Sequence, residues 1–206
     1  MKEEYIVDYE NMVRCSVINR LIQENDYKKY LEIGVFDSHN FNNVEIQYKV
    51  GVDPGTEGFN NVTFPMTSDE FFDLTDDKFD IIFCDGLHYS EQTYKDIVNS
   101  LDHLNESGVI VVHDMNPTTK ELQLRTRECP TCWWNGDCWK SFVQLRTERD
   151  DLDMCVIDAD MGLGIIRRGS QDKLVTSDEL TYENLEQNRE QWLNLVSIDD
   201  FSFEIQ

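Results

Sequence analysis

The stretch FDIIFCDGLH, residues 79–88, decides the fold of this chain, because a nearly continuous apolar run ends there in Asp-Gly. Such a run, rich in aromatic and β-branched residues, predicts a strand that is buried on both faces. A helical pattern follows, with an apolar residue at every third or fourth position through residues 94–104. A buried strand followed by an amphipathic helix is the unit of a parallel sheet with helical crossovers.

The same alternation continues on both sides of this stretch. Short apolar runs at 30–34, 48–52, 62–64 and 108–112 predict further strands, and helical spacing predicts an entry helix over 9–24. We therefore predict an α/β chain with a Rossmann-like doubly wound sheet, mostly parallel, and helices on both faces.

The second half of the chain predicts a different end to the sheet. We expect a turn at 105–108, a helix over 139–145, and two strands at 152–157 and 163–166 joined across 158–160. Two runs separated by a short polar turn indicate a hairpin. The C-terminal part of the sheet is therefore expected to be an antiparallel hairpin.

We divide the chain into a domain over 1–169, which includes an N-terminal helical entry over 1–27, and an acidic extension over 170–206. The extension is expected to be helical and docked on the core. The alternative is that it contacts a second copy of the chain and gives a homo-oligomer.

The composition of the chain excludes some classes of binding partner. The 206 residues include 18 Lys and Arg against 41 Asp and Glu, a formal charge of −23, and 40% hydrophobic residues argue against disorder. A surface this negative disfavours nucleic acid and anionic membranes as partners. The N-terminal residues lack the apolar region of a signal peptide, so we expect a cytoplasmic protein with reduced cysteines.

Polar residues follow nearly every predicted strand, which is where an open α/β sheet binds its ligands. They are Glu32, Gly34, Asp53, Ser68, Asp69, Asp85, His88, His113 and Asp114. Asp53 lies 21 positions after Glu32, the spacing of an acid that binds ribose hydroxyls. The first turn, residues 34–39, holds a single glycine, which argues against a pyrophosphate but permits a ribose-containing cofactor without one.

In order and spacing these motifs resemble the class I S-adenosylmethionine-dependent methyltransferases over about residues 9–168. YLEIG at 30–34 is similar to the first motif of that family, and GVDP at 51–54 to its ribose-binding acid. Residues 79–88 resemble the fourth strand with its turn, and NESGVIVVHD at 105–114 the fifth. The chain departs from the family in its first loop, where further glycines are usual.

The resemblance implies an enzyme that uses S-adenosylmethionine as its cofactor. Glu32 and Gly34 would line the methionine end, Asp53 the ribose, and Met66 to Asp69 the adenine edge. The full set of cofactor-binding residues implied in this way is Glu32, Gly34, Asp53, Thr67, Ser68, Asp69 and Asp85.

The Asp85-x-x-His88 pattern with Asp114 is similar to metal-dependent sugar O-methyltransferases. That likeness implies a divalent metal, Mg²⁺, held by Asp85, Asp114 and His113, with His88 as general base beside Asp85. Mg²⁺ prefers carboxylate oxygens, and a histidine can take a proton near neutral pH. The alternatives are that His88 caps or packs a helix start and that His113 only orients its neighbours.

The segment from Cys129 to Trp139 has two interpretations. Cys129, Cys132 and Cys138 supply three of the four ligands of a structural zinc site, or they are free thiols. The indoles of Trp133, Trp134 and Trp139, with Asn116, would line an acceptor pocket for a small molecule or glycan, or they only close the core. Two rival functions remain beside methyl transfer: a non-catalytic cofactor- or glycan-binding or assembly protein, and a metal-dependent hydrolase.

Overall fold

The computed structural model describes residues 13–55, 62–127 and 133–204. Its centre is a seven-stranded sheet in the order β2-β1-β3-β4-β6-β5-β7. The strands are β1 (Lys29–Ile33), β2 (Tyr48–Val52), β3 (Phe79–Cys84), β4 (Leu104–Val112), β5 (Leu152–Ile157), β6 (Leu163–Arg168) and β7 (Leu195–Val196). The first four strands are parallel, β6 runs antiparallel to both β4 and β5, and β7 pairs in parallel with β5. The predicted fold class and the predicted hairpin are confirmed.

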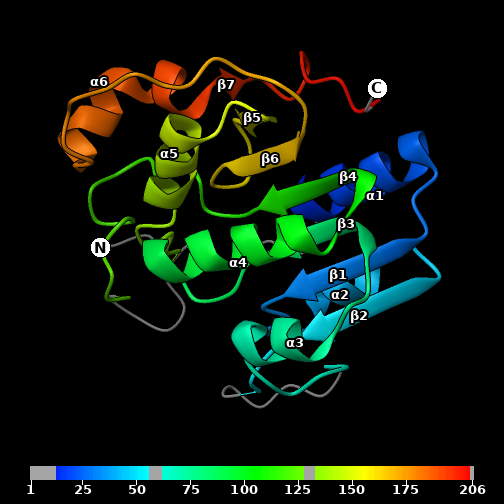
Figure 1. Ribbon diagram of the computed structural model, residues 1–206. Coiled ribbons are helices and arrows are strands. Elements are labelled where there is room, and N and C mark those ends of the chain that lie inside the picture. Colours follow the sequence, from blue (N-terminus) through cyan, green and yellow to red (C-terminus); the bar gives the residue numbers. More distant parts are fainter. Residues whose placement is uncertain (1–12, 56–61, 128–132, 205–206) are drawn as a thin grey trace.

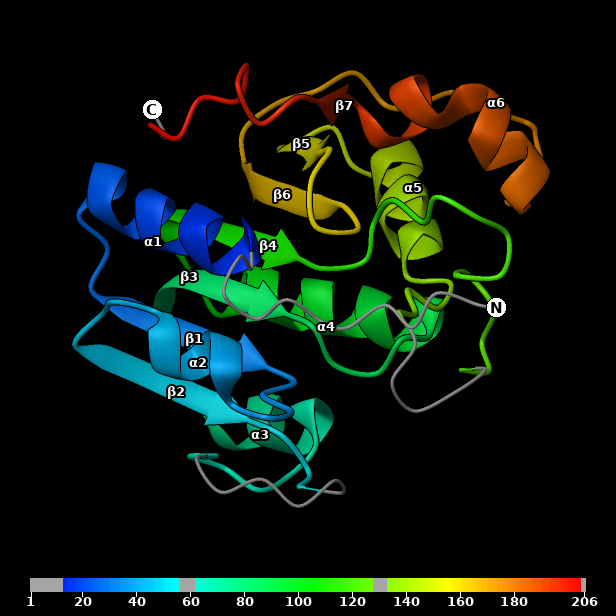
Figure 2. The same cartoon turned by 180° about the vertical axis from the view of Figure 1, so that it is seen from behind.

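Helices cover both faces of the sheet (Figure 1). The view from behind shows α1 and α2 in front of the parallel strands, whereas α3, α4 and α5 lie on the opposite face (Figure 2). The helices are α1 (Val13–Asn25), α2 (His39–Asn43), α3 (Ser68–Leu74), α4 (Ser90–Asp102), α5 (Trp139–Glu148) and α6 (Tyr182–Leu193). No helix in these described ranges is both long and apolar enough to cross a membrane.

Strand β3 shows why its sequence is apolar without alternation. Ile81 and Phe83 are buried in the core on the α1 side, while Ile82 and Cys84 are buried in the core on the α4 and α5 side. Because successive side chains of a strand point to opposite faces, a strand covered on both sides needs apolar residues at every position.

The prediction of a turn at 105–108 is wrong, because these residues belong to β4. The pairing of β3 with β4 shifts in register between Phe79 and Ile81, which accommodates extra residues in β4. The side chain of Asn105 donates to Asp80 across this irregularity. A bulge with polar residues has the same composition as a turn, and the sequence alone did not separate the two.

Other boundaries differ by a few residues. The described part of the entry helix begins at Val13, and the capping residue of α3 is Thr67 rather than Ser68. The strand predicted at 62–64 is reduced to a single parallel bridge from Phe64 to Val52.

The C-terminal segment packs on the rest of the chain. Trp192 of α6 stacks on Trp139 of α5, with ring centroids 6.1 Å apart. Further along, Arg20 of α1 lies over the ring of Phe203, 3.9 Å from its centroid. The division of the chain near residue 169 and the homo-oligomer stay predictions.

Candidate active site

The pairing register aligns the carboxyl ends of four strands. Ile33 pairs with both Val52 and Cys84, and Cys84 pairs with Val112. The next residue of each strand therefore lies along one edge of the sheet: Gly34, Asp53, Asp85 and His113. The order β2-β1-β3 makes this edge a topological switch point, where open α/β sheets bind ligands.

The loop after β1 approaches the end of β3 closely. Gly34 has φ +84°, and a Cβ there would lie 2.0 Å from the carbonyl oxygen of Asp85. Ser38 also has a positive φ, +64°, and occupies the N-cap position before α2, where its side chain makes no capping hydrogen bond. Only glycine fits position 34, so the loop depends on that residue for its path.

Asp53 ties β2 to this loop. Its Oδ2 accepts from the backbone N–H of Phe36 at 3.1 Å, and its Oδ1 accepts from that of Gly55 at 2.8 Å. Each carboxylate oxygen keeps a second lone pair for a ligand hydroxyl. Asp53 is thus oriented as the predicted ribose-binding acid would need to be.

Glu32 is buried and accepts hydrogen bonds from the hydroxyl of Tyr30 and the amide of Asn40. Burial raises the pKa of Glu32 to about 8, although both bonds oppose the shift. Nearby, Ser38 Oγ and Asn40 Oδ1 are buried without a hydrogen-bond partner among the described residues. Unpaired buried polar atoms at a loop that faces the site fit a polar ligand group.

The predicted adenine edge is tied together by side chains of two helices. Thr67 caps α3 and exchanges hydrogen bonds with Glu70, so its hydroxyl is engaged within the protein. Ser68 donates to Asp96 of α4 at 2.6 Å. Asp96 was not predicted as a site residue; burial raises its pKa to about 6. Its position on a helix face gave no sequence signal beyond that of a polar residue.

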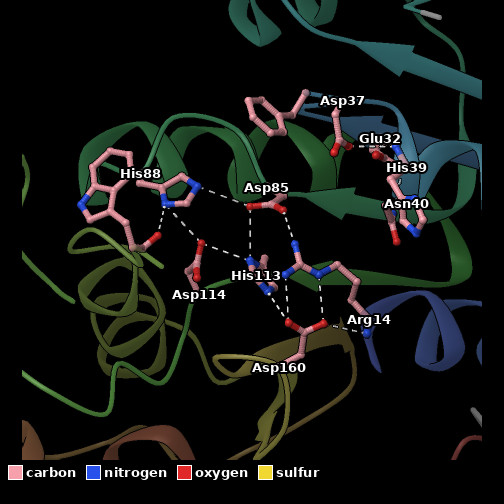
Figure 3. Close-up of polar contacts among 12 residues, drawn as sticks. Arg14, Glu32, Asp37, His39, Asn40, Asp85, His88, His113, Asp114 and Asp160 are labelled. Atoms are coloured by element: carbon pink, nitrogen blue, oxygen red, sulfur yellow. Dashed lines mark hydrogen bonds and ion pairs between the residues drawn. The ribbon is translucent and has the colours of Figure 1, made fainter. Parts of the chain in front are cut away.

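Four residues from the ends of β3 and β4 converge (Figure 3). His113 Nδ1 lies 3.3 Å from Asp85 Oδ1 and 3.1 Å from Asp114 Oδ2. His88 Nδ1 lies 3.2 Å from Asp114 Oδ2, and its Nε2 lies 3.5 Å from Asp85 Oδ1. One ligand atom each from Asp85, His113 and Asp114 fall within 4.8 Å of one another, a spacing that could hold a metal ion.

The charges of this cluster depend on one another. Burial opposes protonation of both imidazoles, but the carboxylates of Asp114 and Asp85 outweigh it and raise the pKa of His88, and that of His113 far more. Burial also opposes ionisation of Asp85, yet His113, His88 and Arg14 hold its pKa well below the ordinary range. Within the cluster, each carboxylate therefore favours the protonated form of the imidazoles, and the imidazoles favour the ionised form of Asp85.

Two further members come from distant segments. Arg14 of α1 donates from Nη1 to Asp85 Oδ2 and from Nη2 to Asp160 Oδ1, both at 2.9 Å. Asp160 lies in the β5–β6 turn with φ +46° and is 3.3 Å from His113 Nε2. Neither was predicted, because a lone arginine on a helix and an acid in a hairpin turn are ordinary surface patterns.

His88 is fixed by the loop before α5. Its Nδ1 lies 2.9 Å from the backbone carbonyl oxygen of Trp134, and the two rings stack with centroids 4.6 Å apart. Because a carbonyl oxygen only accepts, Nδ1 carries the hydrogen and Nε2 is left to exchange a proton. Gly136, with φ +61°, packs against His88 so closely that a Cβ would lie 2.0 Å from its carbonyl oxygen.

Residues 15–115, which hold the edge just described, match a family model described as a methyltransferase domain. This part of the chain is similar to a methyltransferase domain. The match confirms the resemblance to class I methyltransferases and the predicted enzyme class. No curated protein matches the chain in sequence.

Solved structures with the same fold share little sequence with this chain. The methyltransferase PaMTH1 of Podospora anserina, bound to S-adenosylhomocysteine, is 15% identical, with 78% of this chain and 80% of that chain covered and a TM-score of 0.56. The O-methyltransferase TomG of Streptomyces achromogenes, in complex with S-adenosylmethionine, is 12% identical, with coverage of 82% and 84% and a TM-score of 0.58. DesVI of Streptomyces venezuelae is 13% identical, with coverage of 79% and 92% and a TM-score of 0.54.

The predicted acceptor residues separate into two groups. Trp134 contacts His88, and Asn116 follows closely after Asp114, where it donates to Asp158 at 2.8 Å. Trp139, by contrast, is fully buried between α5 and α6 and is a core residue, so the structure does not bring it to the cluster.

Trp133 is half-buried in the same loop as Trp134. Cys138 is buried at the start of α5, while Cys129 and Cys132 lie outside the described residues. The zinc site therefore stays a prediction.

Proposed function

We propose that this methyltransferase moves the methyl group of S-adenosylmethionine to a hydroxyl of a small molecule, a sugar or glycan precursor. The observation that carries the proposal is the orientation of His88, whose Nδ1 is held by the Trp134 carbonyl while Nε2 stays available beside Asp85. The cofactor is supported by the similar folds of PaMTH1, bound to S-adenosylhomocysteine, and TomG, in complex with S-adenosylmethionine.

The cofactor would lie along the edge from β2 to β3. Asp53 accepts the ribose hydroxyls, and Ser68 and Asp69 border the adenine. The methionine end lies over the loop after Gly34, where Ser38 Oγ and Asn40 Oδ1 offer polar atoms that the described protein leaves unpaired. S-adenosylmethionine supplies an electrophilic methyl group, so the protein has to position an acceptor and remove its proton.

His88 removes that proton in our proposal. A hydroxyl near Nε2 gives its proton to the imidazole, and the carboxylate of Asp85, 3.5 Å away, stabilises the imidazolium that results. The Nδ1 hydrogen bond to Trp134 fixes the ring, so the base keeps its orientation through the reaction.

The same residues fit a divalent cation. Asp85, Asp114 and His113 bring two carboxylates and one imidazole together, and His113 Nδ1 is buried without a hydrogen-bond partner in the described part of the chain. When bound, the cation would supply a Lewis acid that orients acceptor hydroxyls and lowers the pKa of one of them. Trp134 and Trp133 offer aromatic faces for a sugar, and the formal charge of −23 favours an uncharged acceptor.

The test is transfer of tritiated methyl from S-adenosylmethionine to methyl glycosides, catechols and amines, with the wild-type chain and His88→Gln. We expect labelled methyl ethers from a hydroxyl acceptor and a loss of about 10²–10⁴-fold in kcat for His88→Gln. The control is His103→Gln, because the His103 ring bonds the carbonyl oxygens of Asn99 and Thr75 and packs on Phe72, and none of these belongs to the cluster. Label in amines alone would contradict transfer to oxygen, and cofactor binding without label in any acceptor would favour the non-catalytic alternative.

A further inference from the structure

Asp160 contacts a candidate metal ligand, His113, but is not itself one of the candidate ligands. Its Oδ2 accepts from the backbone N–H and from Nε of Arg14, and its Oδ1 accepts from Nη2, each at 2.9 Å. The same Oδ1 lies 3.3 Å from His113 Nε2. The Asp160 side chain is 7% exposed, so its position is fixed by these contacts within the protein.

This contact decides which nitrogen of His113 is available. Asp160 accepts three hydrogen bonds from Arg14, so its carboxylate acts as an acceptor toward His113 Nε2 as well. In the neutral imidazole, Nε2 then carries the hydrogen and Nδ1 carries the lone pair. Nδ1 points at Asp85 and Asp114, and among the described residues it makes no hydrogen bond.

The net charge of the cluster with neutral imidazoles is equal and opposite to that of one divalent cation. Asp85, Asp114 and Asp160 contribute three negative charges and Arg14 one positive charge, so with neutral imidazoles the group carries 1 − 3 = −2. In the absence of an ion, protonation of the two imidazoles offsets this charge. A bound divalent ion would supply the same charge and leave both imidazoles neutral.

The donor set favours one class of ion. Mg²⁺ is held mainly by carboxylates, phosphates and water oxygens, whereas imidazole nitrogen suits transition metals. A carboxylate bonded to the far nitrogen of a ligating histidine fixes the tautomer and makes the imidazole a better ligand. Asp160 and His113 have this relationship.

We infer that Asp160, clamped by Arg14, positions His113 as a nitrogen ligand, and that the site holds a first-row transition dication in preference to Mg²⁺. Mn²⁺ is the probe of the test below, because it binds most weakly in that series and so makes the comparison with Mg²⁺ stringent. The inference rests on the proposed function in one respect: it concerns the same candidate metal ligands. Its test measures metal binding and does not depend on methyl transfer. It differs from the expectation of Mg²⁺ that the sequence resemblance implied, and the test below decides between the two.

The experiment is electron paramagnetic resonance of Mn²⁺ bound to the chelator-treated full chain, with Mg²⁺ as competitor. We expect Mn²⁺ to bind about tenfold or more tightly than Mg²⁺, and a ¹⁴N modulation from the His113 imidazole in the pulsed spectrum. Asp160→Asn should weaken Mn²⁺ binding about 10–100-fold, while Asp153→Asn, on the same hairpin and paired with Arg167, should leave it unchanged.

His113→Asp keeps a ligand but replaces nitrogen with oxygen, so it should abolish the ¹⁴N signal and lower the preference for Mn²⁺ over Mg²⁺. It also decides the question if Asp160→Asn does not fold. Absence of Mn²⁺ binding, absence of ¹⁴N modulation in the wild type, or an unchanged preference in His113→Asp would overturn the inference. Binding of Mg²⁺ as tight as that of Mn²⁺ would overturn the inference alone, whereas absence of S-adenosylhomocysteine binding to the wild-type chain would overturn the proposed function.

Discussion

The imidazole of His88 lies nearly parallel to the indole of Trp134, with ring centroids 4.6 Å apart and 13° between the planes. The same tryptophan accepts from His88 Nδ1 through its backbone carbonyl oxygen. One residue thus covers a face of the ring and sets its tautomer. The bond depends on the path of the loop, and the stacking depends on the side chain, so the two contributions can be separated by mutation.

Trp134→Ala should lower kcat/KM for the hydroxyl acceptor about tenfold, because the stacking that holds the His88 ring is lost while the carbonyl remains. Trp134→Phe keeps an aromatic face and should retain most of the activity. Steady-state kinetics of the two variants, with S-adenosylhomocysteine affinity measured in parallel, checks this. Equal activity of the Ala and Phe variants would show that stacking does not position the base.

Glu32→Gln should stabilise the protein increasingly as the pH rises from 5 to 8. The folded pKa of Glu32, about 8, lies above its ordinary 4.5, so the unfolded chain loses this proton first and stability falls across that window. At about 1.4 kcal/mol per pKa unit, the cost near pH 8 is on the order of 4 kcal/mol, and glutamine removes it. Urea unfolding at several pH values measures this difference in the free energy of unfolding between Glu32→Gln and wild type. Glu45→Gln, at an exposed position, is the control. A constant difference between Glu32→Gln and wild type across this range would contradict the account.

Gly34→Ala should be far more harmful than Gly55→Ala. Both glycines have a positive φ, +84° and +70°, but only at Gly34 would the new Cβ meet the backbone of Asp85, whereas nothing lies within 4 Å of it at Gly55. Left-handed backbone alone costs alanine roughly 1–2 kcal/mol, which Gly55→Ala should show. Gly34→Ala adds a clash between β1 and β3. Thermal unfolding of the two variants separates the cost of left-handed backbone from the cost of the clash. An equal loss of stability in both variants would contradict the close approach of Gly34 to the backbone of Asp85.

Arg189→Gln should raise the KM for the acceptor with little change in cofactor affinity. Arg189 of α6 donates to Asn116 and, at 2.9 Å, to the carbonyl oxygen of Pro117, so it holds the segment that follows Asp114. Losing charged hydrogen bonds of this kind costs about 1.5–3 kcal/mol in positioning that segment. Arg149→Gln, whose partner Asp151 is exposed, is the matched control. An unchanged acceptor KM would show that α6 does not shape the site.

Much of the fold was predictable because buried parallel strands carry a strong sequence signal. The apolar run before Asp85 and the Gly-containing motif at Gly34 placed two neighbouring strand ends, and the register of the sheet brings them together. The limits of β4 were not predictable, since the polar residues 105–108 are accommodated by a register shift that depends on the neighbouring strand.

The site was predictable where its residues follow strands and unpredictable where they do not. Asp85, His88, His113 and Asp114 follow β3 and β4 directly and converge in the structure. Arg14 and Asp160 reach the same point from a helix and a hairpin turn, through contacts between residues 146 positions apart. Such pairings depend on the three-dimensional fold and leave no local pattern. Trp139 looked like a pocket residue, but its partner Trp192 comes from the C-terminal helix.

The most direct test of the central claim is calorimetric titration of the wild-type chain with S-adenosylhomocysteine, beside Asp53→Ala and the exposed control Asp73→Ala. The account predicts one molecule bound per wild-type chain, an affinity lowered about 10–100-fold in Asp53→Ala through loss of the ribose hydrogen bonds, and no change in Asp73→Ala. Absence of binding to the wild-type chain would contradict it.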